Sequence, residues 1–101
     1  MKGFKRIVLS ALALCLALGA AAQAATLKIG SQSPLTGSYA ADGNDIANGA
    51  RAAIDAIVKE GGIPGFDKIE LFAEDDACDP RQAVAAANKL VNEKVVGVVG
   101  S

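Results

Sequence analysis

Four carboxylates and a cysteine lie close together in the second half of this chain. Glu74, Asp75 and Asp76 follow a short apolar run, and Cys78 and Asp79 come directly after them. Acids at the end of a buried strand can bind Mg²⁺ or exchange protons with a substrate. Alternatively, they form a solvated turn in which Asp79 caps the next helix. The sequence favours the structural interpretation, because its capping signals are the more specific.

The capping signals surround Asp79. Pro80 stands at the favoured first helical position, and Gln82 stands three residues after the cap, which is the spacing of a capping box. The chain has no histidine and no phosphate-binding or dinucleotide-binding glycine motif. Histidine-dependent catalysis is therefore excluded within this segment, and we expect neither a metal nor a cofactor.

Alternating strands and helices must position this turn. Apolar runs predict strands at 26–30, 68–74 and 95–99, the third of them covered on both faces. The order β-α-β-α-β predicts an α/β fold, part of a doubly wound parallel sheet with the first strand between the other two. Ligands meet such sheets at the carboxyl edge. The polar residues expected there, which suit a small anionic group such as a carboxylate, are Ser31, Gln32, Ser33, Gly100 and Ser101. Ordinary turn composition also explains these residues, and local evidence alone favours that interpretation.

Two amphipathic helices are expected between the strands. The first runs from a cap at Asn44 or Asp45 to a glycine pair at 61–62, and the second runs from Asp79 to about residue 92. Gly49, inside the first helix, predicts close packing of that helix on the sheet. The expected buried stripes are Ile46, Ala50, Ala53, Ile54, Ile57 and Val58 in the first helix, and Ala83, Val84, Ala87, Leu90 and Val91 in the second.

The first 24 residues have the composition of a secretory signal peptide. Lys2, Lys5 and Arg6 precede an apolar run, and the sequence 22–24 has the small-x-small pattern that signal peptidase reads, so we expect cleavage after Ala24. The rest of the chain keeps seven basic residues against eleven acids. That balance argues against nucleic acid or an anionic membrane as a partner.

Residues 25–101 are expected to be a fragment of one domain. Cys78 is the one cysteine that remains after cleavage, and an odd cysteine in a secreted protein either keeps a thiol or has its partner elsewhere. The apolar run 95–99 ends where a turn and a helix should follow. We therefore expect residues 25–101 to be the amino-terminal part of a longer protein.

Several motifs resemble those of a known family. The glycine-containing motifs look like the opening of type I periplasmic binding proteins of the branched-chain amino acid family, and the cysteine-containing motif is similar to the leucine/isoleucine/valine-binding proteins in particular. The likeness covers essentially all of residues 25–101. The motifs that carry it are Ser33-Pro34-Leu35-Thr36-Gly37, Gly43, Asn48-Gly49-Ala50, Gly61-Gly62-Ile63, Asp75-Asp76-Ala77-Cys78-Asp79-Pro80, Gln82-Ala83-Val84-Ala85, Ala87-Asn88-Lys89 and Val91-Asn92.

The resemblance implies a protein of two α/β lobes, of which this segment is part of the amino-terminal one. Such proteins bind a free amino acid between the lobes and deliver it to an ABC permease in the inner membrane. The resemblance thus implies a periplasmic monomer that is not an enzyme. It also implies that Cys78 forms a disulfide with a cysteine just beyond Ser101.

The resemblance further implies which residues contact the ligand. The main ligand contacts of this lobe would lie just past Ser101. We include Ser101 itself among the expected ligand-binding residues. The family has an aromatic contact immediately before Gly43, but this chain has Asp42 there, which could favour a more polar or cationic amino acid or could simply point to solvent. Tyr39, three residues earlier, could replace the aromatic only if the loop is shaped differently.

Two functions of other kinds stay open. The chain could belong to a secreted α/β enzyme that uses Asp75 and Asp76 for metal or acid–base chemistry. It could also belong to a sensory ligand-binding ectodomain of the same fold, with a transmembrane segment further along.

Overall fold

The computed structural model describes residues 25–100, so the predicted signal peptide and Ser101 lie outside the described residues. Three strands form one parallel sheet: β1 (Thr26–Ser33), β2 (Lys68–Asp75) and β3 (Val98–Gly100). Helix α2 (Ala40–Lys59) connects β1 to β2, and helix α3 (Pro80–Asn92) connects β2 to β3. β1 lies between β2 and β3, which confirms the predicted strand order.

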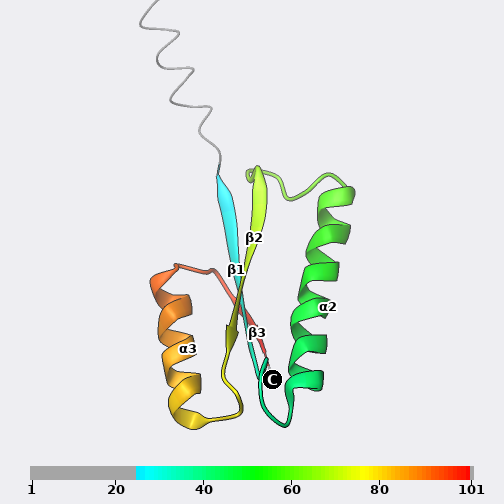
Figure 1. Cartoon of the computed structure of the whole chain (residues 1–101). Coiled ribbons are helices and arrows are strands. Elements are labelled where there is room, and N and C mark those ends of the chain that lie inside the picture. The colour runs from blue at the N-terminus through cyan, green and yellow to red at the C-terminus, as the bar shows by residue number, and fades with distance from the viewer. Residues whose placement is uncertain (1–24, 101) are drawn as a thin grey trace, which may run out of the picture.

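The two helices cover opposite faces of the sheet (Figure 1). The hydroxyl of Ser33 donates to the carbonyl of Gly43 in α2, whereas Gly30 of the same strand leaves room for Leu90 of α3. Odd and even residues of β1 therefore meet different helices, because side chains alternate across a strand. The arrangement of helix, sheet and helix confirms the predicted α/β class. Within residues 25–100 no helix is both long enough and apolar enough to cross a membrane.

β1 and β2 end level with each other. They pair in parallel from Thr26 and Lys68 to Ser33 and Asp75, so β1 runs three residues further than predicted and β2 one residue further. The N–H of Asp76 continues the ladder by donating to the Ser33 carbonyl at 3.1 Å. Because the strands are parallel and end together, the loops that follow them leave the sheet side by side.

β3 is shorter and more exposed than predicted. It pairs with β1 only at residues 98–100, in place of the strand expected at 95–99. Val98 and Val99 are about half exposed, at 53% and 48%. Within the described residues β3 pairs on one side only, and both helices pack mainly over β1 and β2. Residues 25–100 therefore do not cover this strand on both faces, and its full coverage stays a prediction for the longer protein.

α2 begins at Ala40, four residues before the predicted cap at Asn44. Tyr39 is its N-cap residue and contributes no side-chain capping bond. Asn44 lies inside the helix, where its amide group donates to the carbonyl oxygens of Leu35, at 3.1 Å, and Ala40, at 2.7 Å. The polar residue that resembled a cap therefore secures the loop in front of the helix instead.

The carboxyl end of α2 is closed by the predicted glycine pair. Gly61 and Gly62 have φ angles of 110° and 78°, in the left-handed region that glycine adopts without a Cβ clash. The N–H of Gly61 donates to Val58, and that of Gly62 donates to Ile57, at 3.1 and 2.9 Å. These two bonds form a Schellman motif, which satisfies carbonyls that a helix end would leave free.

The buried faces of the helices match the predicted stripes only in part. Leu90 is 1% exposed, as expected, and it shares the inner face of α3 with Ala86. Val84 and Val91, which were predicted to be buried, are 62% and 72% exposed, and Val58 of α2 is also exposed. The buried stripe of α3 follows positions 83, 86 and 90, so the helix is rotated by about one residue from the predicted orientation.

The close approach of α2 occurs at Gly43 and not at Gly49. A Cβ at Gly49 would meet no atom within 4 Å, so the prediction of tight packing there is wrong. A Cβ at Gly43 would lie 2.9 Å from the nitrogen of Pro34 and would overlap its carbonyl group. Gly43 therefore lets the loop after β1 rest directly on the helix.

Candidate functional site

Two loops form the carboxyl edge of the sheet. The β1–α2 loop, residues 34–39, and the β2–α3 turn, residues 76–79, start from the paired strand ends Ser33 and Asp75. This is the edge at which open parallel sheets bind ligands. The residues that shape these two loops are therefore the candidates for a functional site.

The carboxylate of Asp75 ties the two loops together. Its Oδ1 accepts from the N–H of Leu35 at 2.7 Å and from the N–H of Ala77 at 2.9 Å. Its Oδ2 accepts from the hydroxyl of Thr36 at 2.6 Å, and the N–H of Thr36 donates to Oδ1 at 3.4 Å. One side chain at the end of β2 thus holds the start of the loop after β1.

These bonds favour the charged form of Asp75. The Thr36 hydroxyl is the largest influence, and together with the N–H groups of Leu35 and Ala77 it holds the pKa of Asp75 below its ordinary value of 3.8. Partial desolvation acts in the opposite direction without reversing the shift. Asp75 is therefore an ionised hydrogen-bond acceptor at neutral pH.

The turn after β2 contains two residues in the left-handed region. Ala77 and Cys78 have φ angles of 49° and 54°, and such a conformation costs about 1–2 kcal/mol for each residue that has a Cβ. Asp75 accepts from the N–H of Ala77, and the buried Asp76 accepts from that of Cys78 at 3.0 Å. Each acid stabilises the residue two positions further on, as in Asx turns.

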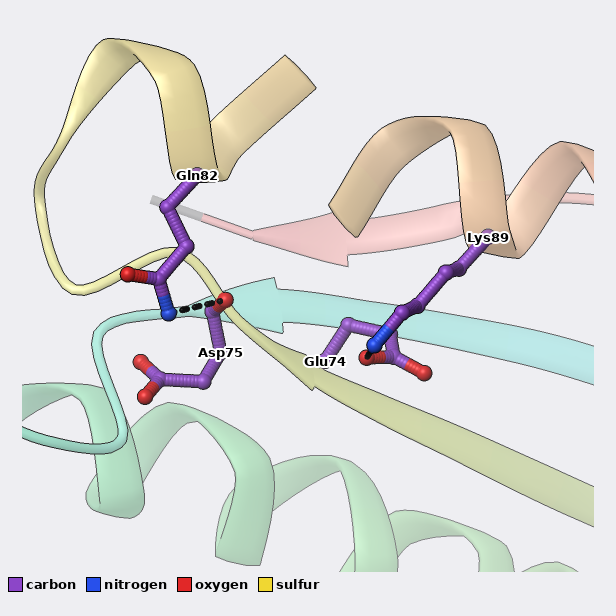
Figure 2. A network of polar contacts seen from close by, with 4 residues as sticks. All are labelled: Glu74, Asp75, Gln82 and Lys89. Carbon is purple, nitrogen blue, oxygen red and sulfur yellow. Dashed lines mark hydrogen bonds and ion pairs between the residues drawn. The ribbon is translucent and has the colours of Figure 1, made fainter. Parts of the chain in front are cut away.

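Asp79 is the N-cap of α3, as predicted, because its carboxylate accepts from the N–H of Gln82 at 2.9 Å. The capping box, however, does not close. The side-chain amide of Gln82 donates to the carbonyl of Asp75 at 3.2 Å (Figure 2). The N–H of Asp79 donates to the carbonyl of Asp76 instead. Gln82 thus joins the start of α3 to the end of β2.

Glu74, the first acid of the cluster, faces α3. Its carboxylate lies 3.6 Å from the ammonium group of Lys89, whose side chain is 68% exposed (Figure 2). Exposed ion pairs of this kind contribute roughly 0–1 kcal/mol. The pair therefore contributes little to the stability of the fold.

Every acid of the cluster thus has a structural partner. Within residues 25–100 no group of His, Cys, Asp and Glu side chains is arranged to hold a metal ion. Of the two acids on which the enzyme hypothesis depended, Asp75 accepts from three backbone N–H groups and Asp76 accepts from one. The geometry supports the structural interpretation of this turn.

The polar residues at the end of β1 are also engaged. Ser33 is fully buried and donates to Gly43, and the side-chain amide of Gln32 donates to the carbonyl of Ala83 at 3.2 Å. Ser31 is 1% exposed, and its hydroxyl has no hydrogen-bond partner among the described residues. Ser33 and Gln32 are thus used within the fold, because β1 continues through them as a central strand, and a ligand role for the strand-end hydroxyls stays a prediction.

Tyr39 and Asp42 are free to meet a ligand. Both side chains are exposed, and Tyr39 caps the helix in whose first turn Asp42 lies. Their separation of three residues places them on one side of the helix start. Of the other predicted functional residues, Ser101 lies outside the described range and Cys78 is exposed with a free thiol.

The residues that sequence reasoning missed are those that fix the loop. Thr36 and Asn44 act on atoms in other elements, and Gly43 is recognised only by its contact with Pro34. The sequence offered one signal for these residues: Thr36 lies within the motif 33–37, and Gly43 and Asn44 follow it closely. That motif marked the segment but assigned no role to any of its side chains.

Comparison with known proteins places the chain among binding proteins. The family described as periplasmic binding protein matches residues 26–101. The Leu/Ile/Val-binding protein BraC3 of Rhizobium johnstonii is 49% identical over 76 residues, covering 75% of this chain and 20% of the relative. The leucine-, isoleucine-, valine-, threonine-, and alanine-binding protein of Pseudomonas aeruginosa is 49% identical over 75 residues, covering 74% and 20%.

A solved structure shares the fold. It is described as a branched-chain amino acid ABC transporter from Rhodospirillum rubrum, and it superposes with a TM-score of 0.69 at 33% sequence identity. The match covers 76% of this chain and 22% of that one. The chain spans about a fifth of the length of each of these three proteins.

Proposed function

This chain belongs to the periplasmic binding protein family, and we propose that it supplies the start of the amino-terminal lobe of an amino-acid-binding protein. The proposed ligand is a branched-chain or related amino acid, and the proposed partner is an ABC permease in the inner membrane. The observation that carries this proposal is the 49% identity, over about three quarters of the chain, to proteins named for binding leucine, isoleucine and valine. Below, the full-length protein is the longer protein that contains this segment.

The proposed contacts lie at the carboxyl edge. The ring of Tyr39 offers an exposed apolar surface with a hydroxyl, and Asp42 offers a negative charge one helical turn away. Asp42 would attract the ammonium group of the ligand or a polar or cationic side chain. The hydroxyl of Ser101 is proposed to bind the carboxylate from the end of β3. The exposure of Tyr39 and Asp42, and the bond that the Ser33 hydroxyl makes to Gly43, support this assignment.

The remaining proposals concern processing. We propose cleavage after Ala24, a periplasmic location, a monomeric state, and a disulfide between Cys78 and a cysteine beyond Ser101. The exposed, free thiol of Cys78 supports the last of these, because nothing within residues 25–100 would prevent a partner from reaching it.

Isothermal titration of the full-length protein tests the function. We expect saturable binding of leucine, isoleucine or valine, with threonine, alanine and lysine as comparisons. Asp42→Asn should change the ratio of affinities for lysine and leucine, because it removes a charge from the ligand side of the helix. Asp55→Asn, in the same helix, also exposed and more than three helical turns from Asp42, is the control and should change neither affinity.

Two results would overturn the proposal. Absence of binding to every amino acid, together with Mg²⁺-dependent turnover, would favour the enzyme hypothesis. Binding by a protein that carries a transmembrane segment beyond this region would favour a sensory ectodomain over a transport component.

A further inference from the structure

We propose that Asp75 is a positioning residue for ligand binding, whose carboxylate holds the β1–α2 loop in the shape that presents Tyr39 and Asp42. The inference rests on the proposed function, since that function gives these two side chains a ligand to meet. Asp75 itself would not touch the ligand, because its carboxylate is occupied by Leu35 and Thr36 of the loop. Its effect would pass through Leu35 and Thr36.

The bonds from Asp75 to the loop are long-range. Leu35 and Thr36 lie 40 and 39 residues away in the sequence, and both present their N–H groups to the same carboxylate. The Thr36 hydroxyl adds the shortest of these bonds, at 2.6 Å. Charged acceptors make stronger hydrogen bonds than neutral ones. The loop is therefore attached to β2 by its first two residues after Pro34.

The opposite side of the loop is attached to α2. The Leu35 carbonyl accepts from Asn44, so this one residue is held at its N–H by β2 and at its C=O by the helix. Pro34 rests against the backbone of α2 at Gly43. With Asp75 removed, only the attachment to the helix remains, and the loop gains freedom on the side that faces β2.

Asp75 also determines the position of the neighbouring turn. Its Oδ1 accepts from Ala77 in the left-handed region, and its backbone carbonyl accepts from Gln82 at the start of α3 (Figure 2). One residue therefore connects the first loop, the second turn and the cap of a helix. We infer that the whole carboxyl edge is rigid before a ligand arrives, and that this rigidity contributes to affinity.

The test combines ligand affinity with amide hydrogen exchange in the full-length protein. Asp75→Ala should speed exchange of the segment 34–39 about tenfold or more and weaken amino-acid binding about tenfold. A loop that keeps its binding-competent shape about a tenth of the time loses affinity by that factor. Asp75→Asn should weaken binding less, because its amide oxygen still accepts from the backbone and its NH₂ can donate to Thr36.

Three further variants separate positioning from general destabilisation. Thr36→Val should reproduce part of the Asp75→Ala effect, and Thr36→Ser, which keeps the hydroxyl, should restore wild-type binding. Asp79→Asn keeps an equally good N-cap in the same acidic turn, so it should change neither affinity nor exchange of the loop. If Asp75→Ala does not fold, as judged by circular dichroism, the two Thr36 variants decide the question.

Each outcome is decisive. Unchanged exchange in Asp75→Ala would overturn the inference, and so would faster exchange with unchanged affinity. If the wild type binds no amino acid, the proposed function has failed, and exchange in the loop still shows whether Asp75 fixes it.

Discussion

The contact between Gly43 and Pro34 gives a prediction about stability. In Gly43→Ala the new Cβ would overlap the carbonyl group of Pro34, and all of the obstructing atoms belong to the backbone. They cannot rotate away as a side chain could. The loop and α2 must therefore move apart by about 1 Å or more to restore ordinary contact distances.

The magnitude follows from three effects. Overpacking of this kind costs about 3 kcal/mol, at the upper end of the usual range. The separation also weakens the buried bond from Ser33 to Gly43, 2.9 Å long, which contributes about 1 kcal/mol. In the opposite direction, alanine stabilises a helix by about 1 kcal/mol relative to glycine. We therefore expect Gly43→Ala to lower the free energy of unfolding by about 3 kcal/mol.

Gly49 supplies the matched control. It lies in the same helix, is exposed, and has no atom within 4 Å of an added Cβ. Gly49→Ala should therefore raise the free energy of unfolding by about 1 kcal/mol. Urea unfolding of the two variants in the full-length protein, followed by circular dichroism, measures both changes. If Gly43→Ala is as stable as Gly49→Ala, the loop does not rest on α2 and the reasoning is refuted.

Three other measurements test the structure. Leu90→Ala should lower the free energy of unfolding by about 3 kcal/mol, because Leu90 is buried against the sheet. Val91→Ala, at a 72% exposed position, should lower it by less than about 0.5 kcal/mol. Urea unfolding of the two variants measures the difference. Because the folded state lowers the pKa of Asp75, its ionised form stabilises the fold above pH 3.8 and this contribution is lost as the pH falls below that value. The stability difference between wild type and Asp75→Asn should therefore be constant from pH 7 to about pH 4 and shrink below it; a constant difference down to pH 2 would contradict the assignment. Cys78 should react readily with a thiol reagent in reduced full-length protein and stay unmodified in the oxidised protein; labelling of both would mean that the disulfide is absent.

Local signals in the sequence predicted the helix ends that depend on neighbouring residues. Asp79 and Pro80 predicted the start of α3, and Gly61 and Gly62 predicted the end of α2, because each signal acts within one turn of chain. The start of α2 was missed because Tyr39 contributes no capping bond and the true role of Asn44 lies outside the helix. An amide that satisfies a loop carbonyl has the same sequence signature as a cap.

Long-range contacts account for the other differences. Gly43 and Gly49 are both helical glycines. Only Gly43 must be glycine, because Pro34 lies against it, and no atom lies within 4 Å of a Cβ at Gly49. Asp75 was recognised as a polar turn residue, yet its partners Leu35 and Thr36 are about 40 residues away. The sequence predicted a site at this edge of the sheet, which stays a prediction, and the role of each side chain there depends on how the two loops meet.

Gly43 also limits how the specificity of this protein could be redesigned. Tyr39 and Asp42 project from the start of α2 and can be varied in a library without disturbing the packing. The position directly after Asp42 accepts no side chain, because the loop backbone already fills that space. With Tyr39 and Asp42 binding the ligand as proposed, engineering for a new ligand would randomise 39 and 42 and keep 43 fixed.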